Sequence, residues 1–427
     1  MDSIESLFDK LWPIYRSLSG DGNRKTIDIL SEISSINKEE IKSGTKILDW
    51  TVPPEYNVND AYIADLDGNR LVDFKINNLH LVSYSLPVDA TLTFDELAER
   101  LHYIEDLPEE IPYITSYYEE YWGFCLSFNQ FKSLDKKTKY RVFIDSNKNT
   151  SGSMTIGQRF FPGKVKKEVL ISTYICHPSL ANNELSGPIL TIFLQKLIED
   201  RKDRYYSYRF VYVPETIGAI YILSKHGENF KKNLQAGLVV TCVGDSGNPT
   251  FKKSKRGNSI IDRLVINNLS SEFTDFNIVD FFPTGSDERQ YCSPYYNLPV
   301  ASLMRTMYTK YKEYHTSADN KSIMDFEGMQ AFINFYNKTL IDLEYIHKYI
   351  VVDGKGEPFL RAHNLNQSLG AQKQVPQMTN IILWALNSST GDCDTLDIAI
   401  ATGSKLSDVY QVCELLCDKG LLNKIKE

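Results

Sequence analysis

The chain has 427 residues, too many for one ordinary hydrophobic core, so two or three domains are expected. Apolar residues make up 42% and charged residues 24%, as in soluble globular enzymes, and no run of about 18 apolar residues could span a bilayer. This composition excludes a membrane-embedded protein. The net charge of −8 counts against nucleic acid as a ligand, because like charges repel phosphate backbones.

The seven cysteines are odd in number, scattered and without a C-x-x-C pair. This usage favours a reducing, cytoplasmic compartment over a disulfide framework, and it also counts against a zinc site made of cysteines alone. Residues 1–12 mix acidic and basic side chains with apolar ones at helical spacing, unlike the basic-then-apolar order of a secretory signal. We therefore expect a cytoplasmic protein that begins with an amphipathic helix.

In residues 3–36, apolar side chains recur at intervals of three and four around a Ser-Gly-Asp-Gly turn, which predicts two helices. Between residues 46 and 84 the period shortens towards two, and Asp-Gly-Asn at residues 67–69 predicts a hairpin. Residues 94–104 have a helical pattern. The tyrosine-rich residues 113–122 are interpreted as a loop whose rings pack and do not bind substrate.

After Gly163, apolar strands alternate with helices, which predicts a mostly parallel sheet covered on both faces. In such sheets, ligands bind at the carboxyl ends of the strands. The predicted strands and helices are 169–174, 187–198, 208–213, 218–227, 237–243 and 299–304.

From about residue 357, three short helical patterns predict a winged-helix or helix-turn-helix module. Its candidate recognition stretch, residues 405–419, carries three acidic residues and two lysines, so it is not basic. We therefore expect it to contact protein or to dimerise and not to bind DNA. The expected fold is a mixed α/β sheet with two additional modules. The boundaries are 1–55 with 161–350 for the catalytic domain, 56–160 for an inserted α+β domain and 351–427 for the winged helix.

Polar side chains follow several of the predicted strands, and two of them are histidines, His177 and His315. Either histidine alone would more often be a hydrogen-bonded structural residue, but both at equivalent strand ends indicate metal ligands. Zinc is the metal that suits imidazole and carboxylate ligands, with one position left for water. Glu215, which follows another strand, is the candidate base for that water, although a carboxylate there could also serve a helix N-terminus.

Further polar residues are assigned to the substrate or to orientation of the site. Asp287, Glu288, Arg289 and Tyr314 are candidates for binding substrate termini, and Asp245 and Asp319 for orienting loops and ligands. Arg289 could pair with a carboxylate and the two acids with a free α-amine. The acidic loop favours an aminopeptidase over a carboxypeptidase.

Five motifs occur in a characteristic order: a histidine after a strand, Asn-Asn-Glu-Leu-Ser-Gly, Pro-Glu-Thr-Ile-Gly, Gly-Ser-Asp-Glu-Arg and Tyr-His-Thr-Ser-Ala-Asp. The order resembles the zinc aminopeptidase and glutamate carboxypeptidase family, and more closely a bacterial aminopeptidase-like group with an inserted small domain and a C-terminal winged helix. The resemblance implies five ligands for two zinc ions and a glutamate base. His177 and His315 match histidine ligands, and Glu215 matches the base.

Three positions depart from that family pattern, since Asn183, Thr216 and Thr241 stand where it has anionic ligands. Two neighbouring dications need carboxylates to neutralise them, so we expect one zinc ion per chain. Glu184 is the candidate third ligand, with Asn183 as an alternative contact.

The sequence thus predicts zinc-dependent hydrolysis of a small peptide or peptide-like amide in an aminopeptidase-type reaction. Two alternatives stay open: a catalytically inactive scaffold that binds partners, or an amidase acting on an amino sugar or glycan precursor. Bacterial relatives in the resembling group are sometimes linked to surface-polysaccharide synthesis, which supports the latter. A homo-oligomer or a protein partner held by the C-terminal module is also compatible with the sequence.

Overall fold

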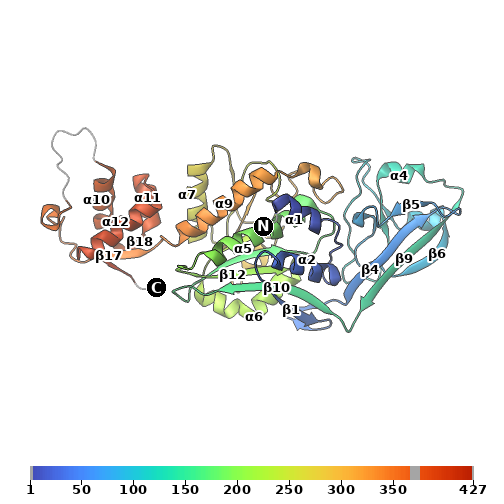
Figure 1. Ribbon diagram of the computed structural model, residues 1–427, viewed down its shortest axis with the longest axis horizontal. Helices are drawn as coiled ribbons and strands as arrows, with labels where there is room; N and C mark the ends of the chain where they lie inside the picture. The colour runs from blue at the N-terminus through green and yellow to red at the C-terminus, as the bar shows by residue number, and fades with distance from the viewer. Residues whose placement is uncertain (1–2, 366–375, 426–427) are drawn as a thin grey trace.

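The computed structural model describes residues 3–365 and 376–425 as three regions in a row, with the inserted region at the right of Figure 1 and the C-terminal module at the left. The central region contains a mixed eight-stranded sheet in the order β1-β10-β12-β11-β13-β16-β14-β15. β11 runs parallel to β12 and β13, and β13 parallel to β16. The strands are β1 Asn37–Lys42, β10 Ser153–Phe161, β11 Glu168–Tyr174, β12 Ser207–Val213, β13 Leu234–Val240, β14 Thr250–Lys252, β15 Asn277–Val279 and β16 Val300–Met304.

Helices cover both faces of this sheet, with α6 on one face and α1, α2, α5, α7 and α9 on the other (Figure 1). Side chains alternate along the buried strand β11, so that Ile171 packs in the core beneath α5 and Leu170 in the core beneath α6. The predicted α/β fold, covered on both faces, is confirmed. The helices of this region are α1 Ile4–Leu11, α2 Asp21–Ser31, α5 Ser186–Asp200, α6 Ile217–Asn233, α7 Ile260–Glu272, α8 Glu288–Tyr291 and α9 Phe326–Leu343.

The inserted region is built on a four-stranded antiparallel sheet in the order β5-β4-β9-β6. The predicted hairpin is present, since β4 pairs with β5 across the Asp-Gly-Asn turn. The predicted helix 94–104 is wrong beyond Ala98, because Leu101–His102 instead pairs with Phe124–Cys125 as a short parallel ladder. The elements are β4 Glu55–Ala64, β5 Arg70–Asp73, β6 Val88–Thr93, α3 Phe94–Ala98, β7 Leu101–His102, β8 Phe124–Cys125, α4 Phe128–Ser133 and β9 Lys139–Asn149. The short hairpin of β2 Lys46–Ile47 and β3 Trp50–Thr51 precedes them, and Ile47 packs in the core beneath α6.

Two predicted boundaries differ from the strand pairing. β10 pairs with β1 and β12, so residues 153–160 lie in the central sheet and not in the inserted region. β17 begins at Lys348 and belongs to the three-stranded sheet of the C-terminal module, a few residues before the predicted start at 351. The elements of this module are β17 Lys348–Val351, α10 Gln377–Ser388, β18 Thr390–Asp394, α11 Thr395–Thr402, α12 Leu406–Asp418 and β19 Leu422–Lys424.

No helix in residues 3–365 or 376–425 has the length and apolar character needed to cross a membrane. The C-terminal module is attached to the central region partly through Arg263 of α7, whose guanidinium pairs with Asp394 and Asp397 at 2.5 Å each. The central sheet therefore carries the inserted region on one side and this module on the other.

A substitution at Gly187 tests how closely α5 must approach the sheet. A Cβ at this position would lie 2.5 Å from Thr173 Oγ1 and 2.6 Å from the carbonyl oxygen of Val240. We expect Gly187→Ala to lower the free energy of unfolding by about 1–3 kcal/mol, because α5 must shift away from β11 and β13. Urea unfolding measures the change. The control is Gly356→Ala, whose Cβ would enter open space, and an equal effect of both substitutions would contradict this packing.

Candidate active site

The site is formed by loops that follow neighbouring strands of the central sheet. His177 comes after β11, Glu215 after β12, and His315 from the loop between β16 and α9. Parallel strands place their carboxyl ends at one edge of a sheet, which brings these three residues together. The geometry agrees, since His177 Nε2 lies 3.7 Å from Glu215 Oε2 and the two histidine rings are 5.7 Å apart between centroids.

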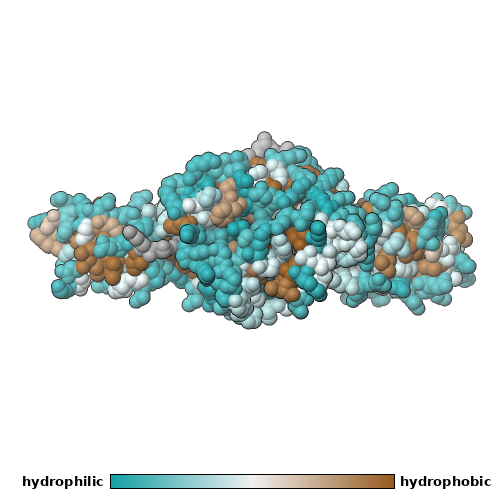
Figure 2. Space-filling model, turned by 90° about the horizontal axis from the view of Figure 1, so that it is seen from below, coloured by the Kyte–Doolittle hydropathy of each residue, from teal (hydrophilic) through white to brown (hydrophobic). Residues whose placement is uncertain are grey.

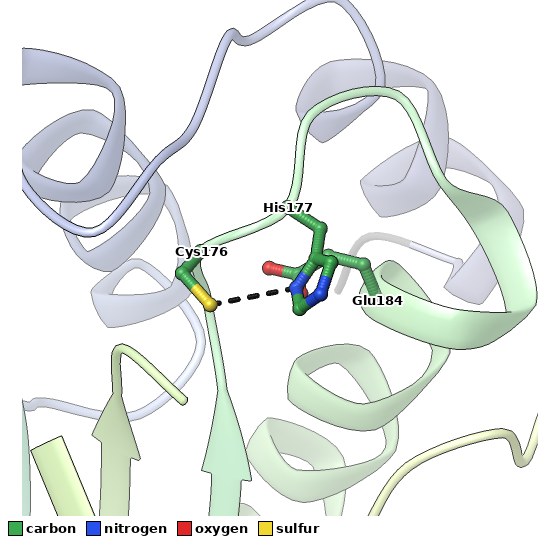
Figure 3. Close-up of side chains that lie close together, drawn as sticks. All are labelled: Cys176, His177 and Glu184. Carbon is green, nitrogen blue, oxygen red and sulfur yellow. Dashed lines mark hydrogen bonds and ion pairs between the residues drawn. The ribbon is translucent and has the colours of Figure 1, made fainter. Parts of the chain in front are cut away.

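His177 is buried and has different neighbours at its two ring nitrogens. Nδ1 lies 2.9 Å from Glu184 Oε2 and 3.4 Å from the Cys176 sulfur, whereas Nε2 faces Glu215. Figure 3 shows the Cys176 thiol and the Glu184 carboxyl group close to the His177 ring. Burial lowers the pKa of His177 to about 3, and the positive charge of Arg16 acts in the same direction. The imidazole is therefore neutral, as a metal ligand must be.

Glu184 is fully buried and its counter-charge is Arg16, which is also fully buried. Arg16 Nε lies 3.7 Å from Glu184 Oε1 and donates a hydrogen bond to the carbonyl of His177, and Nη1 donates to the carbonyl of Leu11. Burial raises the pKa of the Glu184 carboxyl group, and Arg16 opposes that shift. In its ionised form, which Arg16 favours, the carboxylate only accepts hydrogen bonds and then pairs with the tautomer of His177 that carries the proton on Nδ1.

Glu215 is held at the end of β12 by a strained turn. The next residue, Thr216, has a φ of 66°, and its backbone N–H donates to Asp287 Oδ1 at 2.7 Å. The N–H of Glu215 itself points to the Cys176 sulfur at 3.2 Å. Burial, and then the neighbouring charge of Asp287, raise the pKa of Glu215 to about 8. A carboxyl group with this pKa is suited to accept a proton near neutral pH.

His315 is fixed by the inserted region. Its backbone has a φ of 57°, and its carbonyl accepts a hydrogen bond from the N–H of Tyr113 at 2.8 Å. The Tyr113 ring lies 5.1 Å from both histidine rings. Burial lowers the pKa of His315 to about 3, and proximity to His177 adds to the effect. The tyrosine-rich loop does pack, as predicted, but it packs on the two histidines of the site.

Asp319 holds the π-helical turn Ala181–Leu185 that carries Glu184. Its carboxylate accepts backbone N–H bonds from Ala181 and Asn182 through Oδ1 and from Asn183 through Oδ2, at 3.2, 2.6 and 3.0 Å. The side-chain amide nitrogen of Asn183 is buried without a hydrogen-bond partner. Asp319 thus sets the position of Glu184 against His177 from a separate loop.

The remaining predicted residues lie in different surroundings. Glu288 is fully buried, where it pairs with Lys252 at 2.6 Å and accepts from the Ser302 hydroxyl, so its predicted contact with substrate is wrong. Asp287 is buried beneath the Thr216 turn, and Asp245 accepts the backbone N–H groups of Gly247 and Thr306. The oxygens of Glu288 are occupied by Lys252 and Ser302, whereas Asp287 Oδ2 is buried without a hydrogen-bond partner.

Two cavities meet at Glu215 and Arg289, which line both of them. The first, of about 590 Å³, contains His177 and a wall of aromatic residues. The second, of about 760 Å³, contains Tyr314 and His315. Both volumes are in the range of small-molecule sites, roughly 300–1,000 Å³. The junction between them is where a reacting bond could reach both Glu215 and the histidines.

The side chains present provide zinc-compatible donors. Cys176, His177 and Glu184 place a sulfur, a nitrogen and an oxygen within 4.8 Å of one another, and Glu184 Oε1 has no hydrogen-bond partner. Imidazole, thiolate and carboxylate are the ligands that zinc takes in proteins. Nε2 of His177, Glu215 and the neutral His315 offer further nitrogen and oxygen donors on the cavity side, so the donor chemistry on both sides of the His177 ring fits zinc.

A family model described as "Domain of unknown function (DUF4910)" matches residues 5–345, and a winged helix-turn-helix model matches residues 347–424. A Clostridium acetobutylicum protein is 42% identical over 99% of this chain and 96% of its own length. Its provisional name is polysaccharide biosynthesis protein with aminopeptidase-like domain.

Solved structures extend the comparison. A crystal structure of a provisionally named peptidase from the same organism matches with a TM-score of 0.89 at 41% identity, over 99% of this chain and 96% of that one. The zinc aminopeptidase BSAP of Bacillus subtilis matches with a TM-score of 0.57 at 10% identity, over 80% of this chain and 95% of that one. At such low identity the second match concerns the fold alone.

Asp319 provides a test of how the site is held together. We expect Asp319→Asn to lower the free energy of unfolding by about 2–3 kcal/mol. An amide has only one oxygen, so it cannot accept hydrogen bonds at both of the positions now occupied by Oδ1 and Oδ2. Chemical denaturation measures this loss. The matched control is Asp67→Asn, exposed in the β4–β5 turn. If Asp319→Asn were as stable as this control, the carboxylate would not be holding the turn.

Proposed function

The chain belongs to the DUF4910 family, and we propose that it hydrolyses a peptide or peptide-like amide bond with the help of one zinc ion. The single observation that carries this proposal is Glu215 Oε2, 3.7 Å from Nε2 of the neutral His177 at the junction of two cavities. A base beside a neutral imidazole is the arrangement required for activating water next to a metal. The zinc aminopeptidase fold of BSAP agrees with this chemistry.

We assign the zinc ligands to the side of His177 that faces the cavities. Nδ1 is engaged by Glu184 in a hydrogen bond, and the buried Arg16 beyond it would repel a dication on that side. Nε2 and the nearby His315 are therefore the nitrogen ligands. In this proposal Glu184 orients His177, as carboxylates commonly do for metal-binding histidines, in place of the role of third ligand that the sequence predicts.

When bound, zinc would supply a Lewis acid that polarises the carbonyl of the scissile amide. The protein's own residues carry the remaining work. Glu215 takes a proton from the attacking water, whose oxygen bonds to the carbonyl carbon, and returns it to the amine that leaves as the carbon–nitrogen bond breaks. Arg289, which donates to the Thr216 hydroxyl at 2.7 Å, holds the turn that positions Glu215.

We propose one ion per chain because several polar side chains of the site are uncharged. The Thr241 hydroxyl is bonded to Tyr174 and to the carbonyl of Asn183, and the Thr216 hydroxyl accepts from Arg289. None of these side chains is anionic, so a second dication would lack the carboxylates that neutralise it. The same shortage supports a second candidate function, an inactive peptidase-fold scaffold that binds no metal.

Replacing Glu215, together with measurements on the wild-type protein, separates the zinc-dependent hydrolase from the inactive scaffold. We expect Glu215→Gln to lower kcat for amide hydrolysis by about 10²- to 10⁴-fold, because the base is lost while the histidines remain. Elemental analysis of the same preparation should give close to one zinc per chain. The matched control, Glu228→Gln on the exposed face of α6, should keep full activity. Wild-type protein with neither zinc nor turnover would support the scaffold instead.

We further propose that the C-terminal module contacts protein, either a second copy of the chain or another protein. Its helix α12 carries Asp408, Glu414 and Asp418. Large apolar side chains, Phe359 and Trp384 among them, are exposed in this module, and Figure 2 shows brown apolar patches at that end of the molecule. Acidic and apolar surfaces are unsuited to phosphate backbones.

The nucleic-acid alternative has a direct test. We expect no saturable shift of duplex DNA by the full chain at low salt, where electrostatic binding is strongest, because α12 lacks a basic surface. An electrophoretic mobility assay measures this. Clear saturable binding that weakens on raising the salt would contradict the assignment of the module to protein contact.

A further inference from the structure

The first of the two cavities has an aromatic wall and a polar wall. Trp50, Tyr117 and Tyr118 form one side, and Arg289 and Gln290 line the other. We propose that this aromatic-walled cavity binds a pyranose ring, so that the amide cleaved at Glu215 belongs to an N-acylated amino sugar. The inference rests on the proposed amide hydrolysis and specifies its substrate class.

Two aromatic side chains of this wall are exposed, although large aromatic side chains are ordinarily packed in the interior. Trp50 of β3 is 37% exposed and Tyr118 of the inserted region is 51% exposed, and their rings lie 5.9 Å apart at 65°. Tyr118 has a φ of 67°, a strained backbone for a bulky residue. Exposed amphipathic rings at a cavity offer an apolar face to the C–H surface of a sugar and a polar edge to its hydroxyl groups.

The opposite wall supplies hydrogen-bond donors. The Nε of Arg289 is buried without a hydrogen-bond partner, while its Nη2 is already bonded to Thr216. The guanidinium lies near the carboxyl groups of Glu215 and Asp287. It can therefore donate to a neutral hydroxyl group, and Gln290 beside it can both donate and accept.

The same linings disfavour a free α-amine. Among the described residues, Glu215 is the one carboxylate lining either cavity, and the second cavity contains the cation Lys310 as well as Arg289. Glu288, which would have bound an ammonium group, is paired with Lys252 in the interior. An amine that is acylated, and hence neutral, fits these surroundings better than the charged terminus that an aminopeptidase requires.

The second cavity accommodates the acyl group. Its lining includes Phe282, Met307 and Tyr314, and it meets the aromatic-walled cavity at Glu215. With the sugar ring on one side and the acyl group on the other, the amide lies at the junction. Water oxygen bonds to the acyl carbon, the bond from that carbon to the sugar nitrogen breaks, and the nitrogen takes a proton. The products are a carboxylate and a free amino sugar.

The test uses the full-length Glu215→Gln variant, which should hold the ligand without cleaving it. Saturation-transfer NMR titrations with N-acetylglucosamine should detect binding, and adding Trp50→Ala should weaken it about tenfold, equivalent to roughly 1.4 kcal/mol. The matched control adds Trp384→Ala, which removes an exposed tryptophan from the C-terminal module and should leave binding unchanged. Tyr118→Ala is a second variant of the wall, in case Trp50→Ala fails to fold.

Two outcomes would overturn the inference: no binding of N-acetylglucosamine, or binding that is equally strong without Trp50 and without Tyr118. Wild-type turnover then separates the inference from the function on which it rests. Hydrolysis of leucinamide without sugar binding would reject the sugar site and retain amide hydrolysis. Sugar binding that depends on Trp50, with no release of amine from any amide, would support the sugar site and reject the hydrolytic function.

Discussion

The buried pair of Arg16 and Glu184 is the constraint on which the rest of the site depends. Both side chains are fully removed from solvent, so each charge depends on the other and on the carbonyls of Leu11 and His177, which accept hydrogen bonds from Arg16. Arg16 comes from the N-terminal segment, whereas Glu184 comes from the turn before α5. Their pairing fixes the N-terminal helices against the sheet and gives His177 a defined partner for Nδ1.

The loops around His177 are held by groups from distant parts of the chain. Asp319 binds the turn that carries Glu184, and Tyr113 of the inserted region contacts both histidine rings. The inserted region therefore contributes to the candidate site and supplies Tyr117 and Tyr118 to the aromatic wall of one cavity. In the sugar-binding proposal, this wall takes the place of an amine-binding pocket on an aminopeptidase-like fold.

The sequence predicted the central fold because its strands are short apolar runs separated by helical periods, and such patterns arise locally. It also brought His177, Glu215 and His315 together, since strand ends share an edge of the sheet. It could not reveal Tyr113 or Arg16, whose roles arise from contacts across the whole chain. Glu288 was misassigned for the same reason: only the fold shows that Lys252 lies beside it. The helix expected to reach residue 104 ended at Ala98 because Leu101 pairs with Phe124, a partner outside any local window.

The central claim is that His177 and His315 bind zinc on the cavity side while Glu184 orients His177 from behind. The most direct test is a crystal structure of zinc-loaded protein with anomalous data collected at the zinc absorption edge. The account predicts one anomalous peak per chain, bonded to Nε2 of His177 and to His315. A peak bonded to Nδ1 of His177 together with Cys176 and Glu184, or two peaks in the site, would contradict it.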